Sequence, residues 1–149
     1  MRRGKPGGDL RPETRETRTE ARLLKCAMLV SKVLVALVAL EHVYILVLEM
    51  FLWTGPRGRK AFGLSEEFAR ATKGLAANQG LYNGFLAAGL FWSLWPGAAS
   101  MSTALQLFFL GCVLVAAVFG ALTAKRSILF VQGGPALAAL IAVLASRSS

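Results

Sequence analysis

Two glutamates and one histidine lie in the apolar stretch ALEHVYILVLEM, residues 39 to 50. They are Glu41, Glu49 and His42, which is the single histidine of the chain. Carboxylates and an imidazole can bind a cation or a polar solute, or act together as acid and base. On a helix, His42 and Glu49 are seven residues apart, so they lie on nearly one face with ~10 Å between them. What they can do depends on the segment that positions them.

The composition indicates that this segment crosses a membrane. Of the 149 residues, 55% are hydrophobic and 17% are charged, and the mean hydropathy is +0.54. Apolar residues form four segments, at about 28–53, 75–95, 103–123 and 128–145. Each is near the ~20 residues that span ~30 Å of hydrocarbon as a helix. We therefore expect an all-α fold, a four-transmembrane-helix bundle over residues 28–146, in a multi-pass protein of the plasma membrane.

The amino-terminal tail, residues 1–27, is basic and polar, and its composition predicts disorder. Its eight Lys and Arg residues favour a cytoplasmic amino terminus, whereas the basic loops after the first and third segments favour the opposite orientation. A mis-assigned start, with translation beginning at Met28, would remove this conflict. Peptides from residues 1–27 in mass spectra of the native protein would exclude it. We expect both termini to lie outside the cell.

The first loop combines basic residues with a short amphipathic helix. Ser65 is placed to cap that helix at its amino terminus. Arg57, Arg59 and Lys60 form a basic loop at the membrane surface, where they would attract anionic lipid headgroups. The formal charge of +9 lies mainly in the tail and loops. The lipid bilayer, and not nucleic acid, is therefore the expected partner.

Polar residues of the other segments are expected at the depth of Glu49. Asn78, Gln79 and Asn83 lie near the start of the second segment, and Gln132 lies near the start of the fourth. Charged and amide side chains are expensive in lipid, so they normally face the interior of a bundle. We therefore predict an intramembrane polar pocket lined by the four amides together with Glu41, His42 and Glu49 of the first segment. Gly133, Gly134 and Pro135 are expected to distort the fourth helix beside it.

The apolar segments also carry a family resemblance. EHVYILVLEMFLW, ANQGLYNGF and ILFVQGGPAL, within about residues 29–143, resemble the bacterial membrane proteins of domain-of-unknown-function family 1304. The resemblance implies a small four-helix membrane protein that begins close to its first helix. It implies no activity.

Three functions remain open for the pocket. The first is binding or transport of a small polar solute or ion, for which four helices are few, so that a path would require a homo-oligomer. The second is an enzyme acting on a lipid-soluble substrate, with His42 and a glutamate as acid and base. The third is a structural or regulatory membrane subunit in which the amides only hold helices together. We favour the first and lean against an enzyme. No catalytic residue, metal or cofactor is assigned, because metal-ligand spacings such as HxxxH and CxxC are missing from the sequence.

Overall fold

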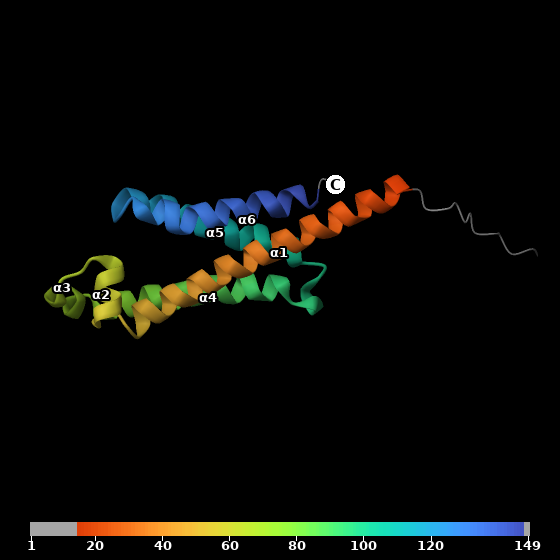
Figure 1. Cartoon of the computed structure of the whole chain (residues 1–149). Helices are drawn as coiled ribbons and strands as arrows, with labels where there is room; N and C mark the ends of the chain where they lie inside the picture. Colours follow the sequence, from red (N-terminus) through yellow and green to blue (C-terminus); the bar gives the residue numbers. More distant parts are fainter. Residues whose placement is uncertain (1–14, 148–149) are drawn as a thin grey trace, which may run out of the picture.

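The computed structural model describes residues 15–147 (Figure 1). Its helices are α1 (Arg15–Met50), α2 (Pro56–Phe62), α3 (Glu66–Ala71), α4 (Lys73–Leu94), α5 (Ser102–Thr123) and α6 (Gly134–Ala145). A 3-10 helix, η1 (Pro96–Ala98), joins α4 to α5, and a π-helix, η2 (Leu129–Gly133), leads into α6. This part of the chain contains no strand, so the predicted all-α fold is confirmed.

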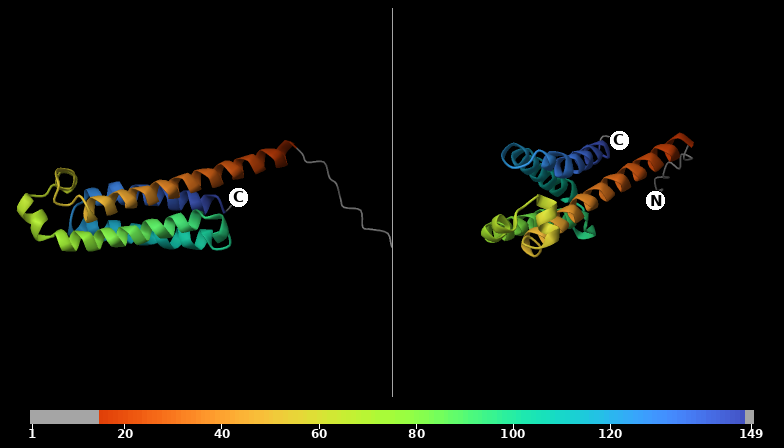
Figure 2. Two further views of the ribbon diagram at one scale, coloured as in Figure 1. Left: turned by 90° about the horizontal axis from the view of Figure 1, so that it is seen from below. Right: turned by 60° about the vertical axis from the view of Figure 1, so that its left-hand side comes forward.

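The long helices lie side by side (Figures 1 and 2). α1 packs against α4 and α6, and α5 packs against the same two helices. The short helices α2 and α3 lie at one end, together with the α5–η2 connection; we call this the cap end. The first turns of α1 and the end of α6 lie at the other end, which we call the terminal end.

Small and branched apolar side chains fill the space between the long helices. The buried residues come from all four of them: Val35, Val38, Ala39, Leu90, Leu110, Val113, Ala136, Ala139 and Val143. Gly89 of α4 packs directly on the ring of Phe109 from α5. Because a glycine at this position leaves room for the ring, α4 and α5 can approach closely.

The helix α1 begins earlier than expected. Residues 15–27 are helical, so the prediction of disorder is wrong for them, and residues 1–14 lie outside the described part. This segment, RETRTEARLLKCA, is rich in Arg, Glu, Ala and Leu, which favour helix. Adding turns to an existing helix avoids the cost of nucleation, so the apolar part of α1 supports its polar extension. The extension projects beyond the other helices (Figure 2).

The first loop contains two short helices where one was expected. Pro56 occupies the first turn of α2, and Gly63 ends this helix with a left-handed φ of 70°. The expected cap of the next helix is confirmed, because the Ser65 side chain accepts a hydrogen bond from the Phe68 amide at 3.2 Å. Gly58 packs against the backbone of Leu52, two residues after the end of α1. A helix turn can sit this close only because residue 58 has no side chain.

Two helices, α1 and α5, are long and apolar enough to cross a membrane, and Leu129–Ala145 forms a shorter apolar helix. The 22 residues of α4 include Asn78, Gln79 and Asn83, which lower its hydropathy. By length and composition, two of the four expected spans are therefore supported. The expected distortion of the last segment is present, as the π-helical turn η2 directly before Gly134 and Pro135.

Candidate functional site

Glu49 and Asn83 meet between α1 and α4. The Asn83 Nδ2 atom donates a hydrogen bond of 2.9 Å to Oε2 of Glu49 and a second of 3.2 Å to the Gln79 carbonyl. Gly80 allows this approach, since a Cβ there would lie 2.6 Å from Cγ of Met50 and 3.1 Å from Cβ of Glu49. The carboxyl group is therefore anchored by an amide of a second helix.

His42 lies deeper between the helices and is only 1% exposed. Its Nδ1 atom is 2.9 Å from the carbonyl oxygen of Val38, one turn earlier in α1. A carbonyl can only accept, so Nδ1 carries a hydrogen and donates it. In a neutral imidazole the lone pair is then on Nε2. The imidazole is held by its own helix and leaves one ring nitrogen for another partner.

Glu41 is half-buried on a neighbouring stripe of α1, which it shares with the buried residues Ile45 and Leu48. Its Oε1 atom is shielded from solvent and has no hydrogen-bond partner among the described residues. An unpaired buried carboxyl oxygen is costly, and such groups commonly mark strain, a catalytic role or an absent ligand. This oxygen is the least satisfied polar atom among the predicted pocket residues.

The remaining predicted pocket residues are placed differently. The side chains of Asn78 and Gln79 are exposed, and Gln79 contributes only its backbone carbonyl to the Asn83 bond. Gln132 is half-buried in the π-helix η2. The structure thus brings Glu49 and Asn83 into direct contact and leaves Asn78 and Gln79 on the outside of α4.

A second polar contact, missed in the sequence, joins α4 to α5 near the terminal end. Ser102 donates to the Ser93 carbonyl at 2.7 Å, and Gln106 donates to the Ser102 hydroxyl at 3.2 Å. Ser93 and Gln106 are 1% and 5% exposed. The signal was Gln106 itself, a polar residue within the apolar run TALQLFFL. The same reasoning that selected Asn83 applies to this residue.

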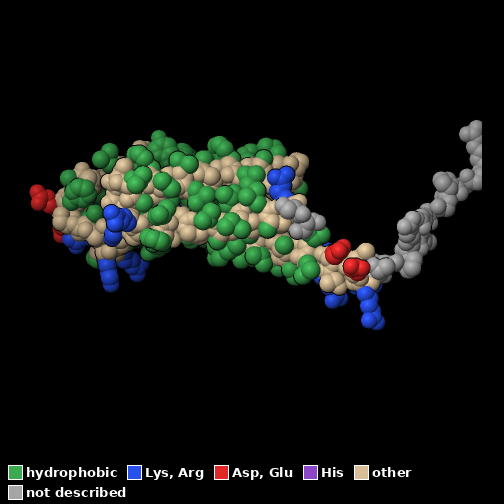
Figure 3. Space-filling view, turned by 90° about the horizontal axis from the view of Figure 1, so that it is seen from above, with side chains coloured by type: hydrophobic (Ala, Val, Ile, Leu, Met, Phe, Trp, Pro, Cys, Tyr) green, Lys and Arg blue, Asp and Glu red, His purple; other side chains and the backbone are tan. Residues whose placement is uncertain are grey.

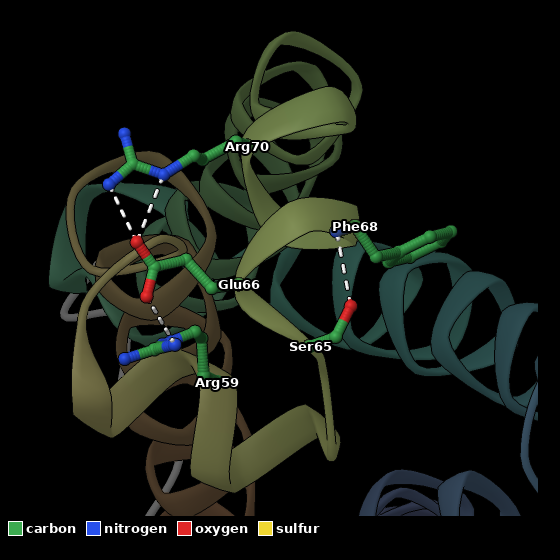
Figure 4. A network of polar contacts seen from close by, with 5 residues as sticks. All are labelled: Arg59, Ser65, Glu66, Phe68 and Arg70. Atoms are coloured by element: carbon green, nitrogen blue, oxygen red, sulfur yellow. Dashed lines mark hydrogen bonds and ion pairs between the residues drawn. The ribbon is translucent and has the colours of Figure 1, made fainter.

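At the cap end, the basic residues of the first loop divide into two kinds. Arg59 and Arg70 both bind Glu66, through contacts of 3.0 Å to Oε2 and of 3.1 and 2.7 Å to Oε1 (Figure 4). Hydrogen bonding and charge from Arg70, with the charge of Arg59, lower the pKa of the Glu66 carboxyl. Arg57 and Lys60 are exposed on α2 and belong to neither of these ion pairs.

Metal binding has no preassembled ligand set in residues 15–147. No group of three or more His, Cys, Asp or Glu side chains lies close enough to hold an ion there. The chemistry available to Glu41, His42 and Glu49 of α1 is hydrogen bonding and proton exchange by two carboxyl groups and an imidazole.

The class defined by this fold is an all-α protein of long apolar helices with polar groups between them. The chain belongs to the family described as "Protein of unknown function (DUF1304)", whose model matches residues 36–144. The match includes Glu41, His42, Glu49 and Asn83.

A relative from Lactococcus lactis subsp. lactis (strain IL1403), the "Uncharacterized protein YpaA", is 36% identical over 111 residues. The similar region covers 73% of this chain and 92% of the relative. No solved structure matches the chain.

Proposed function

We propose that the chain is an integral membrane protein whose four long helices, α1, α4, α5 and η2–α6, cross the bilayer. Large apolar side chains on the outer faces of these helices support this. In the most apolar windows of α1 and α5, only 22% of residues are buried inside the protein, whereas the core helix of a soluble protein is mostly buried. Exposed side chains of this kind include Leu37, Leu40, Phe85, Val115, Phe119, Leu122, Leu137 and Ile141.

The distribution of charge also supports long helices that cross the bilayer. On the face drawn in Figure 3, hydrophobic side chains cover the sides of the molecule, and Lys, Arg, Asp and Glu gather toward its two ends. The 22 residues of α4 and of α5 each span ~33 Å, close to the ~30 Å of the hydrocarbon layer. Shallow hollows along α5 are lined by apolar side chains suited to acyl chains: Phe108, Cys112, Leu114, Val115, Val118 and Phe119.

Within this membrane domain, we propose that the region around Glu41, His42 and Glu49 binds a small polar solute or cation. The observation that carries this proposal is the buried Oε1 atom of Glu41, which has no protein partner. Intramembrane ionisable residues are expensive and usually serve ion or substrate sites. A bound cation or a hydrogen-bond donor would satisfy the oxygen. Glu49, held by Asn83, offers a second carboxyl group about two turns along the same helix.

The test compares the purified wild-type chain with Glu41→Gln and Glu49→Gln, which keep size and hydrogen bonding but remove the titratable charge. Binding of Na⁺, K⁺ and Mg²⁺ is measured by calorimetry, and retained small molecules are identified by native mass spectrometry. We expect each variant to fold normally, by circular dichroism, and to lose binding at least tenfold. Equal binding by wild type and both variants would overturn the proposed site.

A structural role is the second candidate, because the Asn83–Glu49 hydrogen bond joins two helices directly. Interhelical hydrogen bonds of this kind contribute about 0.6 to 2 kcal/mol each. A purely structural pair would lower the thermal stability when broken and leave ligand binding unchanged. The glutamine variants separate the two candidates, since glutamine can still accept the Asn83 hydrogen bond.

A further inference from the structure

The cap end holds its basic residues in fixed positions. The Trp53 indole donates a hydrogen bond of 3.0 Å to the Thr72 hydroxyl and packs against Phe62, with ring centroids 4.8 Å apart. Glu66 of α3 binds Arg59 of α2, which joins the two helices, and it also binds Arg70 of its own helix. These contacts turn the first loop into a compact element on the end of α1. The basic residues of this loop that lie outside the Glu66 ion pairs are therefore held on a fixed surface.

Three of the charges at this end belong to neither Glu66 ion pair. Lys60 lies in the last turn of α2, and Lys125 and Arg126 lie in the α5–η2 connection, far away in sequence. The Nζ atom of Lys125 lies 4.0 Å from the position where a Cβ atom would extend from Gly63. Gly63 follows Lys60 by three residues, so the Lys125 ammonium group lies beside a point of the chain about one helical turn after Lys60.

Arg59 is not available to bind a ligand together with these three residues. Its Nη1 atom binds Glu66, and its Nε atom is buried without a partner. The sequence grouped Arg59 with Arg57 and Lys60, but in the structure its side chain is partly buried and paired with Glu66. Lys125, from a different loop, lies beside the end of α2, and Arg126 is its exposed neighbour in the chain.

Exposed aromatic side chains accompany these charges at the cap end. Phe51 follows α1, Phe68 lies on α3 and Phe130 lies in η2; they are 70%, 54% and 76% exposed. Aromatic rings beside Lys and Arg are typical of a membrane–water interface, where the rings enter the acyl boundary and the cations meet headgroups. Basic side chains also gather near this end on the face drawn in Figure 3.

We propose that Lys60, Lys125 and Arg126 form a composite binding site for the phosphate of an anionic phospholipid headgroup. The inference rests on the membrane-insertion part of the proposed function and is independent of the solute site. The two loops meet around the end of α2, so one headgroup can contact both. Its acyl chains would lie beside the exposed aromatic residues. Lipid binding there would hold the cap against the long helices.

The experiment reconstitutes the full chain in nanodiscs of phosphatidylcholine and phosphatidylglycerol, and counts retained lipids by native mass spectrometry. The test variant is K60Q/K125Q/R126Q. The control is R22Q/K25Q/K32Q, which removes the same number of exposed charges near the terminal end. Since each basic side chain near an anionic surface strengthens binding about fivefold, we expect the test variant to lose phosphatidylglycerol retention at least tenfold. The control should retain it.

Equal losses in both variants would overturn the composite site, because general charge would then explain retention. Displacement of the lipid by millimolar inorganic phosphate would overturn the commitment to a lipid headgroup. Resistance of the wild-type chain to alkaline carbonate extraction from cell membranes is measured separately. Extraction by carbonate would contradict membrane insertion itself, so the two failures are distinguishable.

Discussion

Glu49 and Asn83 form the one hydrogen bond between two side chains of the predicted pocket within residues 15–147. The amide satisfies one oxygen of a carboxyl group that would otherwise lie between two helices without a partner. An unsatisfied buried polar group costs more than the hydrogen bond itself contributes. Asn83 therefore determines whether Glu49 is tolerated at this position.

Asn83→Leu should destabilise the protein by about 0.6 to 2 kcal/mol, because it removes the hydrogen-bond donor to Glu49. Thermal unfolding of the detergent-solubilised protein, followed by circular dichroism, measures the change. Asn78→Leu is the matched control, since Asn78 is exposed five residues earlier on α4. If the two variants unfold at the same temperature, the Glu49–Asn83 bond does not stabilise the fold.

The sequence selected Glu49 and Asn83 by depth but placed Asn78 and Gln79 beside them. Counting residues along a helix estimates depth well, and it does not fix which face turns inward. The buried face of α4 follows the small residues Ala76, Gly80 and Ala87. Asn78 lies ~160° around the helix from Gly80, on the opposite side. Reading the small residues as the packing stripe would have separated Asn83 from Asn78.

Among the helices, glycines set how closely α4 approaches its neighbours. A Cβ atom at Gly89 would collide with the ring of Phe109, whereas one at Gly111 of α5 would meet nothing within 4 Å. Gly89→Ala should therefore destabilise the fold by about 1 to 3 kcal/mol through overpacking. Gly111→Ala is the control, and it should be neutral or slightly stabilising because alanine favours helix. Similar melting temperatures for both variants would argue against the close α4–α5 contact.

The stability of the cap should depend on pH through the ion pairs of Glu66 with Arg59 and Arg70, which we call the clamp. Arg70 and Arg59 lower the pKa of Glu66 in the folded cap. The clamp therefore stabilises the cap fully at a pH above the pKa that Glu66 has in the unfolded chain. That contribution is lost as the pH falls through the lowered, folded-state value. Trp53 fluorescence in a W92F/W95F background reports the cap, since Trp53 bonds to Thr72.

We expect the Glu66→Gln variant to show at neutral pH the Trp53 signal that the unmodified cap reaches only in acid. Glu67→Gln is the control, because Glu67 is an exposed neighbour outside both ion pairs. An E66Q signal that equals that of E67Q across the titration would show that the clamp does not order the cap.

The predicted bounds of the apolar segments lie within a few residues of α4, of α5 and of η2 and α6 taken together, but they miss the start of α1. Strong apolar runs bounded by Gly, Pro and charged residues made this straightforward. The polar extension at residues 15–27 was harder to predict, because its composition fits both disorder and a helix supported by its neighbour. The helix α2 was missed because its seven residues depend on contacts such as Gly58 against Leu52, which no local pattern reveals.

Across the whole molecule, charge is concentrated at both ends, so the orientation depends on which charges lie at the membrane surface. The cap end holds Arg57, Arg59, Lys60, Arg70, Lys73, Lys125 and Arg126 within short connections. The basic residues between Arg15 and Met28, which the structure describes, lie on the projecting part of α1, and Arg15 is ~20 Å from Met28 along the helix axis. For Arg15, Arg18 and Arg22 this distance exceeds the ~8 Å over which a surface potential acts at physiological salt.

We therefore expect the cap end to face the cytoplasm and the terminal end to face outward. Cys26, exposed near the terminal end, tests this in a Cys112→Ser background, because the described residues hold no other cysteine. A membrane-impermeant maleimide should label Cys26 in intact cells as fully as it does after lysis. A cysteine placed at Ala61 of the cap, in a variant that lacks both native cysteines, should react only after lysis. The opposite pattern would place the basic cap outside and would make the polar part of α1 the cytoplasmic anchor.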